Sequence, residues 1–456
     1  MPIDPQSVLF DPLKPKDALA QLPARAAVFS LYGAEAHAEP YIGRTPNLSA
    51  RLARLLQPST KHPRRLQLAG LVRRIEWRLT GSEFEALLLQ FLLLEQVHGA
   101  KCLERMHLRA PAFVRFLGSN AYPRISVTHR PSQREAAWSY GPFASRAAAE
   151  RFADEALKLF LLRRCTEELD PNPNHPGCVY SEIKMCLAPC FQGCTDERYG
   201  EEAAAVERFL ATRGESRLVM LRTQRDEASA RLEFESAAAL HAQTLRVESI
   251  RALAPDVVRP LAQLRAAILQ ASANPDEVCV FLYDNGRLRG PAVFSTLGMR
   301  IQNEQSGSTS LFAHPMAIEA IPELPSQDAP TENALAADTT FAGAPIAELR
   351  VAAGVVPASA ADQPIKLARA IKLARGTLEA RMEAALSALK EPAEPPSATL
   401  RQGHLALVKR WYYRPEVRRA GEIFFPDSEG RWPVKALLRG AGRVAAKMLA
   451  AANPAE

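Results

Sequence analysis

Cysteines gather in the middle of the chain at a spacing that could hold a metal ion or an iron–sulfur cluster. Five of the seven cysteines lie in one short stretch, at Cys165, Cys178, Cys186, Cys190 and Cys194. One ion or cluster must be reached by several thiolates from a bendable segment, and residues 171–177 (PNPNHPG) supply the bends. A disulfide framework is the alternative. It is disfavoured because the chain is much longer than the small secreted domains that depend on disulfides, and its N-terminus does not read as a signal peptide.

The cysteines also belong to a longer sequence pattern. Residues 140–143 read YGPF, residues 162–165 read LRRC, and residues 178–190 read CVYSEIKMCLAPC. This order resembles the central part of UvrC, the nuclease subunit of bacterial nucleotide excision repair. The resemblance implies that four residues ligate a [4Fe–4S] cluster, with zinc as the alternative: Cys165, Cys178, Cys186 and Cys190. Cys194 is additional to the family pattern.

A group of residues near the N-terminus has the types needed to contact a phosphate. Ala26–Leu31 is a short apolar run that predicts a strand, and Tyr41-Ile42-Gly43 follows a turn-rich break. Asn47 is placed to cap an amphipathic helix that carries Arg51, and Arg44 comes just before this helix. The pattern therefore predicts a strand, a second strand and an arginine-bearing helix.

Ser82 and Glu85 have the spacing of a capping box, which opens a further helix containing Gln90. With the preceding strands and helix, this order resembles a GIY-YIG nuclease domain. In that family a tyrosine of the first motif helps to take a proton from water, an arginine clamps the phosphate, and a glutamate holds Mg²⁺ or Mn²⁺. The resemblance implies that the site residues are Tyr41, Arg44, Arg51, Phe29 and Gln90.

The last two of these residues depart from the family pattern. Phe29 stands where the family has the tyrosine of its first motif, and Gln90 stands where it has the metal-binding glutamate. Loss of a positioned base typically costs roughly 10²–10⁴ in rate. Hard divalent ions prefer anionic oxygen, which an amide lacks. We therefore expect contact with nucleic acid to persist and cleavage to be lost, with any Mg²⁺ or Mn²⁺ doubtful.

Plainer interpretations of the same residues remain open. Tyr41 could be a packed strand tyrosine, Arg51 a solvated helix residue and Gln90 a surface polar residue. One of three neighbouring glutamates could replace the missing metal ligand: Glu83, Glu85 or Glu95. Helical spacing is expected to put none of the three in the place of Gln90.

Arginines are interspersed with apolar residues in the segment 107–134. A strand pair with a solvated face is favoured there over contact with a nucleic-acid backbone and bases. A helix is expected from its cap at Ser145 to about Leu162, and it delivers Cys165 to the cysteine segment. Beyond the cysteines, a charged helix is expected over Asp196–Thr212.

A helical pair follows, over Leu218–Leu232 and Phe234–Leu253. Its centre, ARLEFESAAAL, resembles a UVR motif, although the Arg-Asp that ends that motif is His241-Ala242 here. The resemblance implies docking to a UvrB-like protein, with Phe234 anchoring the turn of the hairpin. An ordinary hairpin buried within this chain is the alternative. The implied partner-binding residues are Leu232, Phe234, Ala237, Ala238 and Leu240.

The C-terminal half opens with a β-hairpin signal. Val278–Tyr283 and Arg287–Phe294 flank Asn285-Gly286, which favours a type I′ turn. This hairpin resembles the one that opens the second half of UvrC, but no RNase H-like nuclease or helix-hairpin-helix tail is recognisable after it.

The rest of the C-terminal half has weaker signals. Pro322–Ala361 is rich in alanine and proline and is expected to be flexible, and a basic helix is expected over residues 365–390. The last module is expected to contain strands and one helix, at Leu405–Tyr412, Glu422–Phe425 and Val434–Leu449. Residues 409–414 mix basic and aromatic side chains, which would suit a single-stranded or flipped base, and a plain sheet edge is the alternative.

Composition sets only broad limits. The 456 residues carry a formal net charge of +7, mostly through arginine. Arginine suits phosphate, but a genome rich in G and C would enrich it equally, so charge alone does not establish nucleic-acid binding. No stretch is expected to span a membrane, because the apolar run 87–94 is short and contains Gln90, and a cytoplasmic protein is expected.

These patterns together predict an α/β multidomain protein. Its expected parts are a small GIY-YIG α/β domain, a Cys-rich cluster module, a helical UVR hairpin and a C-terminal mixed α/β region. The boundaries, with the linker before the cysteines included in the second part, are 22–105 (GIY-YIG-like), 106–200 (cysteine module), 201–255 (UVR hairpin), 256–320 (β-hairpin region), 321–365 (flexible linker) and 366–456 (C-terminal region).

The resemblance covers about the first two-thirds of the chain and implies a UvrC-like excision repair protein that binds DNA and UvrB. Three hypotheses are compatible with it. The chain is an endonuclease with an altered site, a non-catalytic DNA-binding regulator, or an iron–sulfur scaffold that serves protein contacts. A nicking assay separates the first two, and salt-dependent DNA binding separates the second from the third.

Overall fold

The computed structural model describes most of the chain outside one long segment. The flexible linker predicted for residues 321–365 lies outside the described residues, as does the first half of the predicted basic helix; in the second half, residues 378–388 are helical. The described residues before 298 and after 378 belong to one compact unit. The described residues are 5–35, 37–57, 68–132, 134–297, 299, 378–390 and 396–452.

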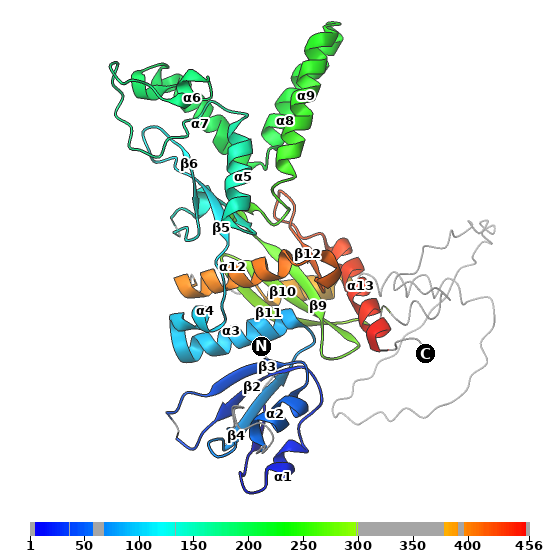
Figure 1. The fold of residues 1–456 in the computed structure, drawn as a ribbon. Coiled ribbons are helices and arrows are strands. Elements are labelled where there is room, and N and C mark those ends of the chain that lie inside the picture. Colours follow the sequence, from blue (N-terminus) through cyan, green and yellow to red (C-terminus); the bar gives the residue numbers. More distant parts are fainter. Residues whose placement is uncertain are drawn as a thin grey trace, which may run out of the picture. The chain divides into compact units, whose positions relative to one another are not determined.

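The N-terminal module is a four-stranded antiparallel sheet in the order β1-β4-β2-β3 (Figure 1). The predicted strands and helix are present, and Asn47 caps α2 by accepting a hydrogen bond from the amide of Ala50 at 2.9 Å. The sequence analysis missed the two remaining strands and the short α1. The elements are β1 (Gln6–Leu9), α1 (Pro15–Leu19), β2 (Ala27–Tyr32), β3 (Tyr41–Thr45), α2 (Leu48–Leu56) and β4 (Arg74–Leu79).

Helix α3 (Glu83–His98) follows the sheet and is capped by Ser82, whose Oγ accepts from the amide of Glu85 at 3.1 Å. Together with the short α4 (Cys102–Arg105), it forms a stretch long and apolar enough to cross a membrane by length and composition. The expectation that no such stretch exists is therefore wrong. Phe84, Leu88 and Phe91 are nevertheless buried in the main hydrophobic core.

A second four-stranded sheet has the order β6-β5-β7-β8. The predicted strand pair is present, and Arg115 on β5 pairs with Glu135 at 2.7 Å. Helix α5 begins after Ser145 but ends at Leu157, earlier than predicted, because the next three amides bond to carbonyls three residues back and tighten the last turn. The elements are β5 (Ala112–Phe116), β6 (Ile125–Thr128), β7 (Ser139–Phe143), β8 (Arg259–Pro260), α5 (Arg146–Leu157), α6 (Val179–Glu182) and α7 (Asp196–Ala211).

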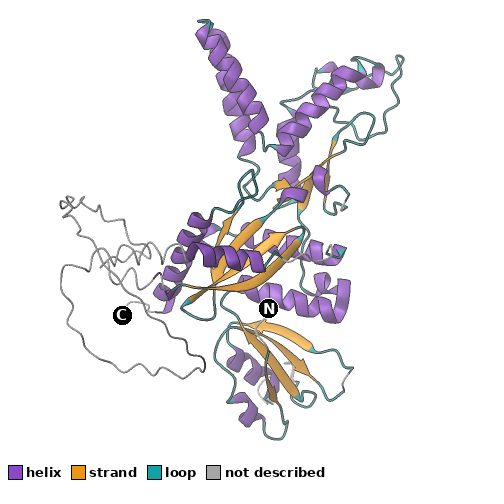
Figure 2. Cartoon of the chain, turned by 180° about the vertical axis from the view of Figure 1, so that it is seen from behind, coloured by secondary structure: helices purple, strands orange, loops and turns teal. Residues whose placement is uncertain are grey.

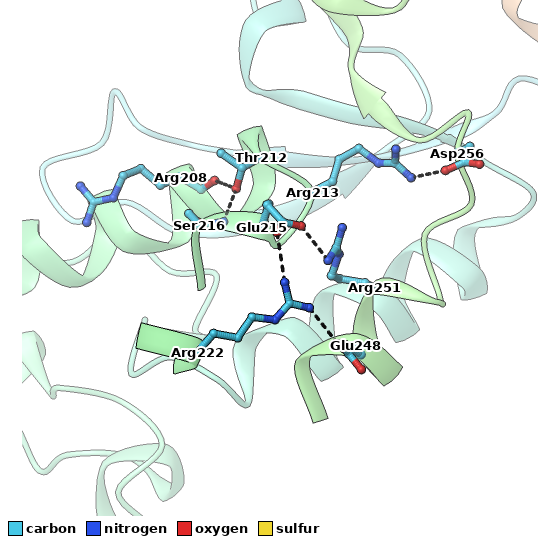
Figure 3. Close-up of polar contacts among 9 residues, drawn as sticks. All are labelled: Arg208, Thr212, Arg213, Glu215, Ser216, Arg222, Glu248, Arg251 and Asp256. Carbon is cyan, nitrogen blue, oxygen red and sulfur yellow. Dashed lines mark hydrogen bonds and ion pairs between the residues drawn. The ribbon is translucent and has the colours of Figure 1, made fainter. Parts of the chain in front are cut away.

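The predicted helical pair is an antiparallel hairpin of α8 (Glu215–Ala230) and α9 (Phe234–Arg251), which lie side by side in Figures 1 and 2. Ion pairs join the helices at the base of the hairpin (Figure 3). Glu215 binds Arg251 at 2.9 Å and Arg222 at 3.6 Å, and Arg222 also binds Glu248 at 3.1 Å. This network links both helices close to the point where they join the core.

The third sheet has the order β11-β10-β9-β12. Asn285 and Gly286 have φ angles of 50° and 76°, so the turn between β10 and β11 has the two left-handed residues of the predicted type I′ turn. The elements are β9 (Ala266–Ala271), β10 (Glu277–Asp284), β11 (Arg287–Ser295), β12 (Glu422–Phe424), α12 (Ala398–Tyr412) and α13 (Val434–Ala452).

The strand predicted at Leu405–Tyr412 is wrong, because these residues belong to α12. Ser397 caps this helix by accepting from the amide of Leu400 at 3.1 Å. Residues 403–408 are all buried, so α12 is covered over most of its circumference there and its apolar residues have no helical periodicity. A short apolar run of this kind reads equally well as a buried strand. With its three sheets and their helices, the described chain has the predicted mixed α/β class.

Candidate nucleic-acid pocket and cysteine loop

The five site residues implied by the N-terminal resemblance line one open pocket of about 740 Å³. They come from four elements, since β2, β3, α2 and α3 each contribute at least one side chain. We call this cavity the N-terminal pocket. Its lining includes Phe29, Tyr41, Arg44, Arg51 and Gln90, together with Thr80, Ser82 and Glu83.

Phe29 and Gly43 are paired across β2 and β3, and the phenyl ring lies over the glycine. A Cβ atom built on Gly43 would lie only 2.7 Å from Cζ of Phe29, so this close approach requires a glycine. The rings of Phe29 and Tyr41 are 6.1 Å apart between centroids. Phe29 is thus held by packing at the pocket wall, where it offers no oxygen or nitrogen atom.

The charged groups of the pocket favour an anion over a cation. Arg44 and Arg51 bring guanidinium groups, and Gln90 brings a neutral amide. The carboxylate of Glu83 is held by Arg414, at 2.7 Å and 2.8 Å, and by Arg44 at 3.5 Å. The hydrogen bonds from Arg414, followed by the charges of Arg414 and Arg44, lower the pKa of Glu83, so this carboxyl group is ionised and already paired with arginine.

Glu83 shares a face of α3 with Gln90, although helical spacing was expected to put no glutamate in the place of Gln90. The two residues are seven positions apart, close to two full helical turns, and both line the pocket. The spacing was a usable signal for Glu83. Arg414 belongs to the basic and aromatic segment 409–414, but no sequence signal placed it beside Glu83, from which it is separated by 331 positions.

Glu85 lies on the opposite side of this first turn and is mostly buried. Its Oε2 accepts a hydrogen bond from the amide of Gly81 at 2.8 Å. Burial raises its pKa from 4.5 to about 7, despite the opposing effect of hydrogen bonds from the backbone of Gly81 and Ser82. The capping carboxyl group is therefore poised to titrate near neutral pH.

Glu85→Gln is expected to stabilise the protein at pH 8 relative to the unaltered chain. Because the folded-state pKa lies above the unfolded value, the folded state holds its proton more tightly, and stability falls as pH rises from about 4.5 to about 7. The ionised form costs at most roughly 3 kcal/mol, and glutamine keeps an oxygen for the amide of Gly81. Denaturant unfolding at pH 5 and pH 8 measures the effect, and an equal loss of stability in both proteins would contradict it.

The four cysteines of the expected cluster lie near one another in a loop between α5 and α7, with none in a disulfide. Burial, together with smaller effects of the other three cysteines, raises the pKa of the Cys186 thiol to about 11. Cys186 Sγ accepts from the amide of Ala188 at 3.3 Å. Among the residues that the structure describes, no three His, Cys, Asp or Glu side chains are close enough to hold a single metal ion.

The backbone of this loop is strained between the cysteines. Lys184, Ala188 and Gln192 have φ angles of 56°, 58° and 60°, a left-handed conformation that is costly for residues with a Cβ atom. Such strain persists only where surrounding structure or a bound group fixes the chain, and it is common at functional sites.

The basic and aromatic residues at 409–414 are not free to stack on a base. Trp411 is buried and donates from Nε1 to the carbonyl of Ala420 at 2.8 Å, and Tyr413 donates to the carbonyl of Pro142 at 2.8 Å. They lie in and just after a helix, so the alternative of a sheet edge is also wrong. Arg410 remains exposed.

Comparison with known proteins gives consistent matches to one class of repair protein. The family profile described as the middle domain of UvrC/Cho excinuclease matches residues 113–209. The UvrABC system protein C of Alcanivorax borkumensis is 29% identical over 237 residues, which cover 52% of this chain and 39% of that protein. The protein of the same name from Pseudomonas protegens is 27% identical over 286 residues, covering 62% of this chain and 46% of that protein. No solved structure gives a significant match.

These matches show that the chain is similar to UvrC/Cho excinucleases over part of its length. More particularly, the chain is a UvrC-like protein. It spans less than half the length of these two relatives.

Proposed function

We propose that this chain acts in nucleotide excision repair as a DNA-binding UvrC-like protein, with a GIY-YIG-like N-terminal module that cleaves DNA slowly or not at all. The observation that carries the proposal is the N-terminal pocket, which collects Tyr41, Arg44 and Arg51 from separate elements. These groups suit a backbone phosphate. The same pocket presents a phenyl ring and an amide where hydrolysis needs a proton acceptor and an anionic metal ligand.

DNA binding and nicking, measured on the full chain with lesion-containing duplex and Mg²⁺ or Mn²⁺, test this proposal. We expect binding that weakens as salt is added, because phosphate contacts release counterions, and little nicking with or without UvrA and UvrB. Arg51→Ala should weaken binding and reduce its salt dependence. Robust nicking by the unaltered chain would reject the inactive site, and salt-independent or absent DNA binding would favour a scaffold that serves protein contacts.

We propose further that the cysteine loop holds a [4Fe–4S] cluster through Cys165, Cys178, Cys186 and Cys190. Two observations support an anionic cluster. Arg163 and Arg164 have buried guanidinium N–H groups with no partner among the described residues, next to Cys165 in sequence. In addition, the other three cysteines all act on the thiol of Cys186, so the four thiols lie within reach of one another, as the ligands of one cluster must. When bound, such a cluster would supply redox chemistry or structural support.

The third proposal concerns the hairpin of α8 and α9, which would dock to a UvrB-like protein. Leu232 is 71% exposed and Phe234 is 65% exposed, so the turn is not buried within the described chain. The expectation that Phe234 anchors the turn is therefore wrong. The alternative, a hairpin buried within this chain, does not hold at the end of the hairpin that carries the turn. Exposed apolar residues at one tip are typical of a protein contact, and Ala237, Ala238 and Leu240 follow on α9.

Phe234→Ala is expected to weaken binding to a UvrB-like partner about 10- to 100-fold, the usual range for a buried aromatic anchor of an interface. The side chain is exposed in the free chain, so the melting temperature should hardly change. A pull-down or titration with the partner measures the effect. Val219→Ala, which removes another exposed apolar side chain of the hairpin, is the control, and equal binding by Phe234→Ala and the parent would exclude this tip as the docking site.

A further inference from the structure

Three arginines surround the carboxylate of Glu83 beside the N-terminal pocket. Arg414 binds both carboxylate oxygens in a bidentate pair, and Arg44 approaches one of them. Arg410, on the last turn of α12, adds its charge at the same carboxylate. Two parallel N–H···O bonds from one guanidinium are the geometry by which arginine also binds a phosphate group.

Packing, rather than this ion pair, holds the C-terminal arginines in place. The ring of Trp411 lies 5.5 Å from that of Phe84, and the ring of His404 lies 5.4 Å from that of Phe91, so α12 and α3 share one core. Gly403 lies against the ring of Phe91, where a side chain would clash. Removing the charge of Glu83 should therefore leave the arginines where they are.

The carboxylate of Glu83 can be replaced by another anion at its arginines. The side chains of Glu83 and Arg414 are 44% and 28% exposed, so water and ions reach the pair. A partly exposed ion pair is screened by salt and competes with water, so it is weaker than the same bidentate pair would be if buried. A multiply charged anion that meets several arginines at once can replace the single carboxylate.

We propose that the carboxylate of Glu83 occupies the place that a nucleic-acid phosphate takes beside these arginines, and that the phosphate displaces this carboxylate when DNA binds. The phosphate-binding surface then extends from the N-terminal pocket, with Arg44 and Arg51, onto the C-terminal segment through Arg410 and Arg414. This inference rests on the proposed DNA-binding function and adds to it a second part of the contact surface, one that comes from the far end of the chain.

Glu83→Gln in the full chain tests the inference, with binding to a fluorescent DNA duplex measured by anisotropy over a range of salt. We expect affinity at low salt to rise about 3- to 10-fold and the salt dependence to steepen by about one phosphate contact. Glu150→Gln is the matched control. Glu150 is 46% exposed and pairs with Arg146 at 2.7 Å on α5, so its substitution changes net charge equally, and it should leave binding nearly unchanged.

Arg414→Gln introduced into the Glu83→Gln chain should remove the gain in affinity and the extra salt dependence. Melting temperatures of all variants show that each is folded. The inference is overturned if Glu83→Gln binds DNA no better than Glu150→Gln, or binds worse than the parent. If the parent binds and only this gain is missing, the proposed function stands without the inference, whereas failure of every variant to bind DNA overturns both.

Discussion

Cys186→Ser is expected to abolish cofactor binding and to unfold the cysteine loop. Burial raises the pKa of the Cys186 thiol, and the charges of all three other expected ligands raise it too, so Cys186 lies within reach of each of them. Structural metal sites contribute about 10–16 kcal/mol of apparent binding free energy in zinc-finger peptides, and even a fraction of that is large beside a total folding stability of about 5–15 kcal/mol. Iron and sulfide analysis, a visible absorption spectrum and thermal unfolding of anaerobically purified protein measure the loss.

Cys194→Ser provides the control for this experiment. Cys194 lies just behind the loop and is partly buried, but it is outside the four-cysteine pattern, so the variant should keep its iron and most of its stability. Substituting Cys165, Cys178 or Cys190 should reproduce the effect of Cys186→Ser. Stoichiometric zinc without iron in the parent would show that the site binds zinc and not a cluster. Full iron content in Cys186→Ser would show that the cofactor is bound elsewhere.

The double variant Phe29→Tyr with Gln90→Glu is expected to gain nicking dependent on Mg²⁺. The first change puts a phenol at the wall of the pocket, and the second adds an anionic oxygen on the face of α3 that lines it. A positioned base contributes roughly 10²–10⁴ in rate, and a divalent ion is needed to stabilise the charge on phosphorus. We therefore expect the pair to exceed the parent by about 100-fold or more, while neither single change suffices.

Nicking of a labelled duplex, with Mg²⁺ and with chelator, measures this gain. Arg51→Ala added to the double variant should abolish it, because the arginine that would clamp the phosphate is then missing. A double variant that is folded, binds DNA and remains inactive would show that the pocket lacks more than these two groups. Nicking by the parent that disappears in Arg51→Ala would show that another residue already supplies the metal site.

Features that depend on a few neighbouring residues could be predicted from the sequence. The caps at Asn47, Ser82 and Ser145 are present because a side-chain oxygen satisfies an amide three positions away. The turn at Asn285-Gly286 follows from the left-handed angles these residues tolerate. The ends of helices were less predictable, as at Leu157, because the last turn depends on how the following chain packs.

Long-range features could not be predicted in this way. The run at Leu405–Tyr412 has no periodicity that separates a strand from a helix, and its packing against α3 selects the helix. Strands β1 and β4 carry weak local signals and are fixed by pairing, β1 with β4 and β4 with β2.

The sequence by itself determined which chemical groups this protein has: clustered thiols, a tyrosine and arginines that we propose contact a phosphate, and a phenyl ring and an amide at the two positions where the proposed site would need a base and a metal ligand. Local chain geometry alone brings the cysteines near one another, because few residues separate them. Only the tertiary structure gathers Phe29, Arg51 and Gln90 around one pocket and brings Arg414 to Glu83 across 331 positions. Such contacts depend on the packing of whole elements in a shared core, which no local pattern of residues encodes.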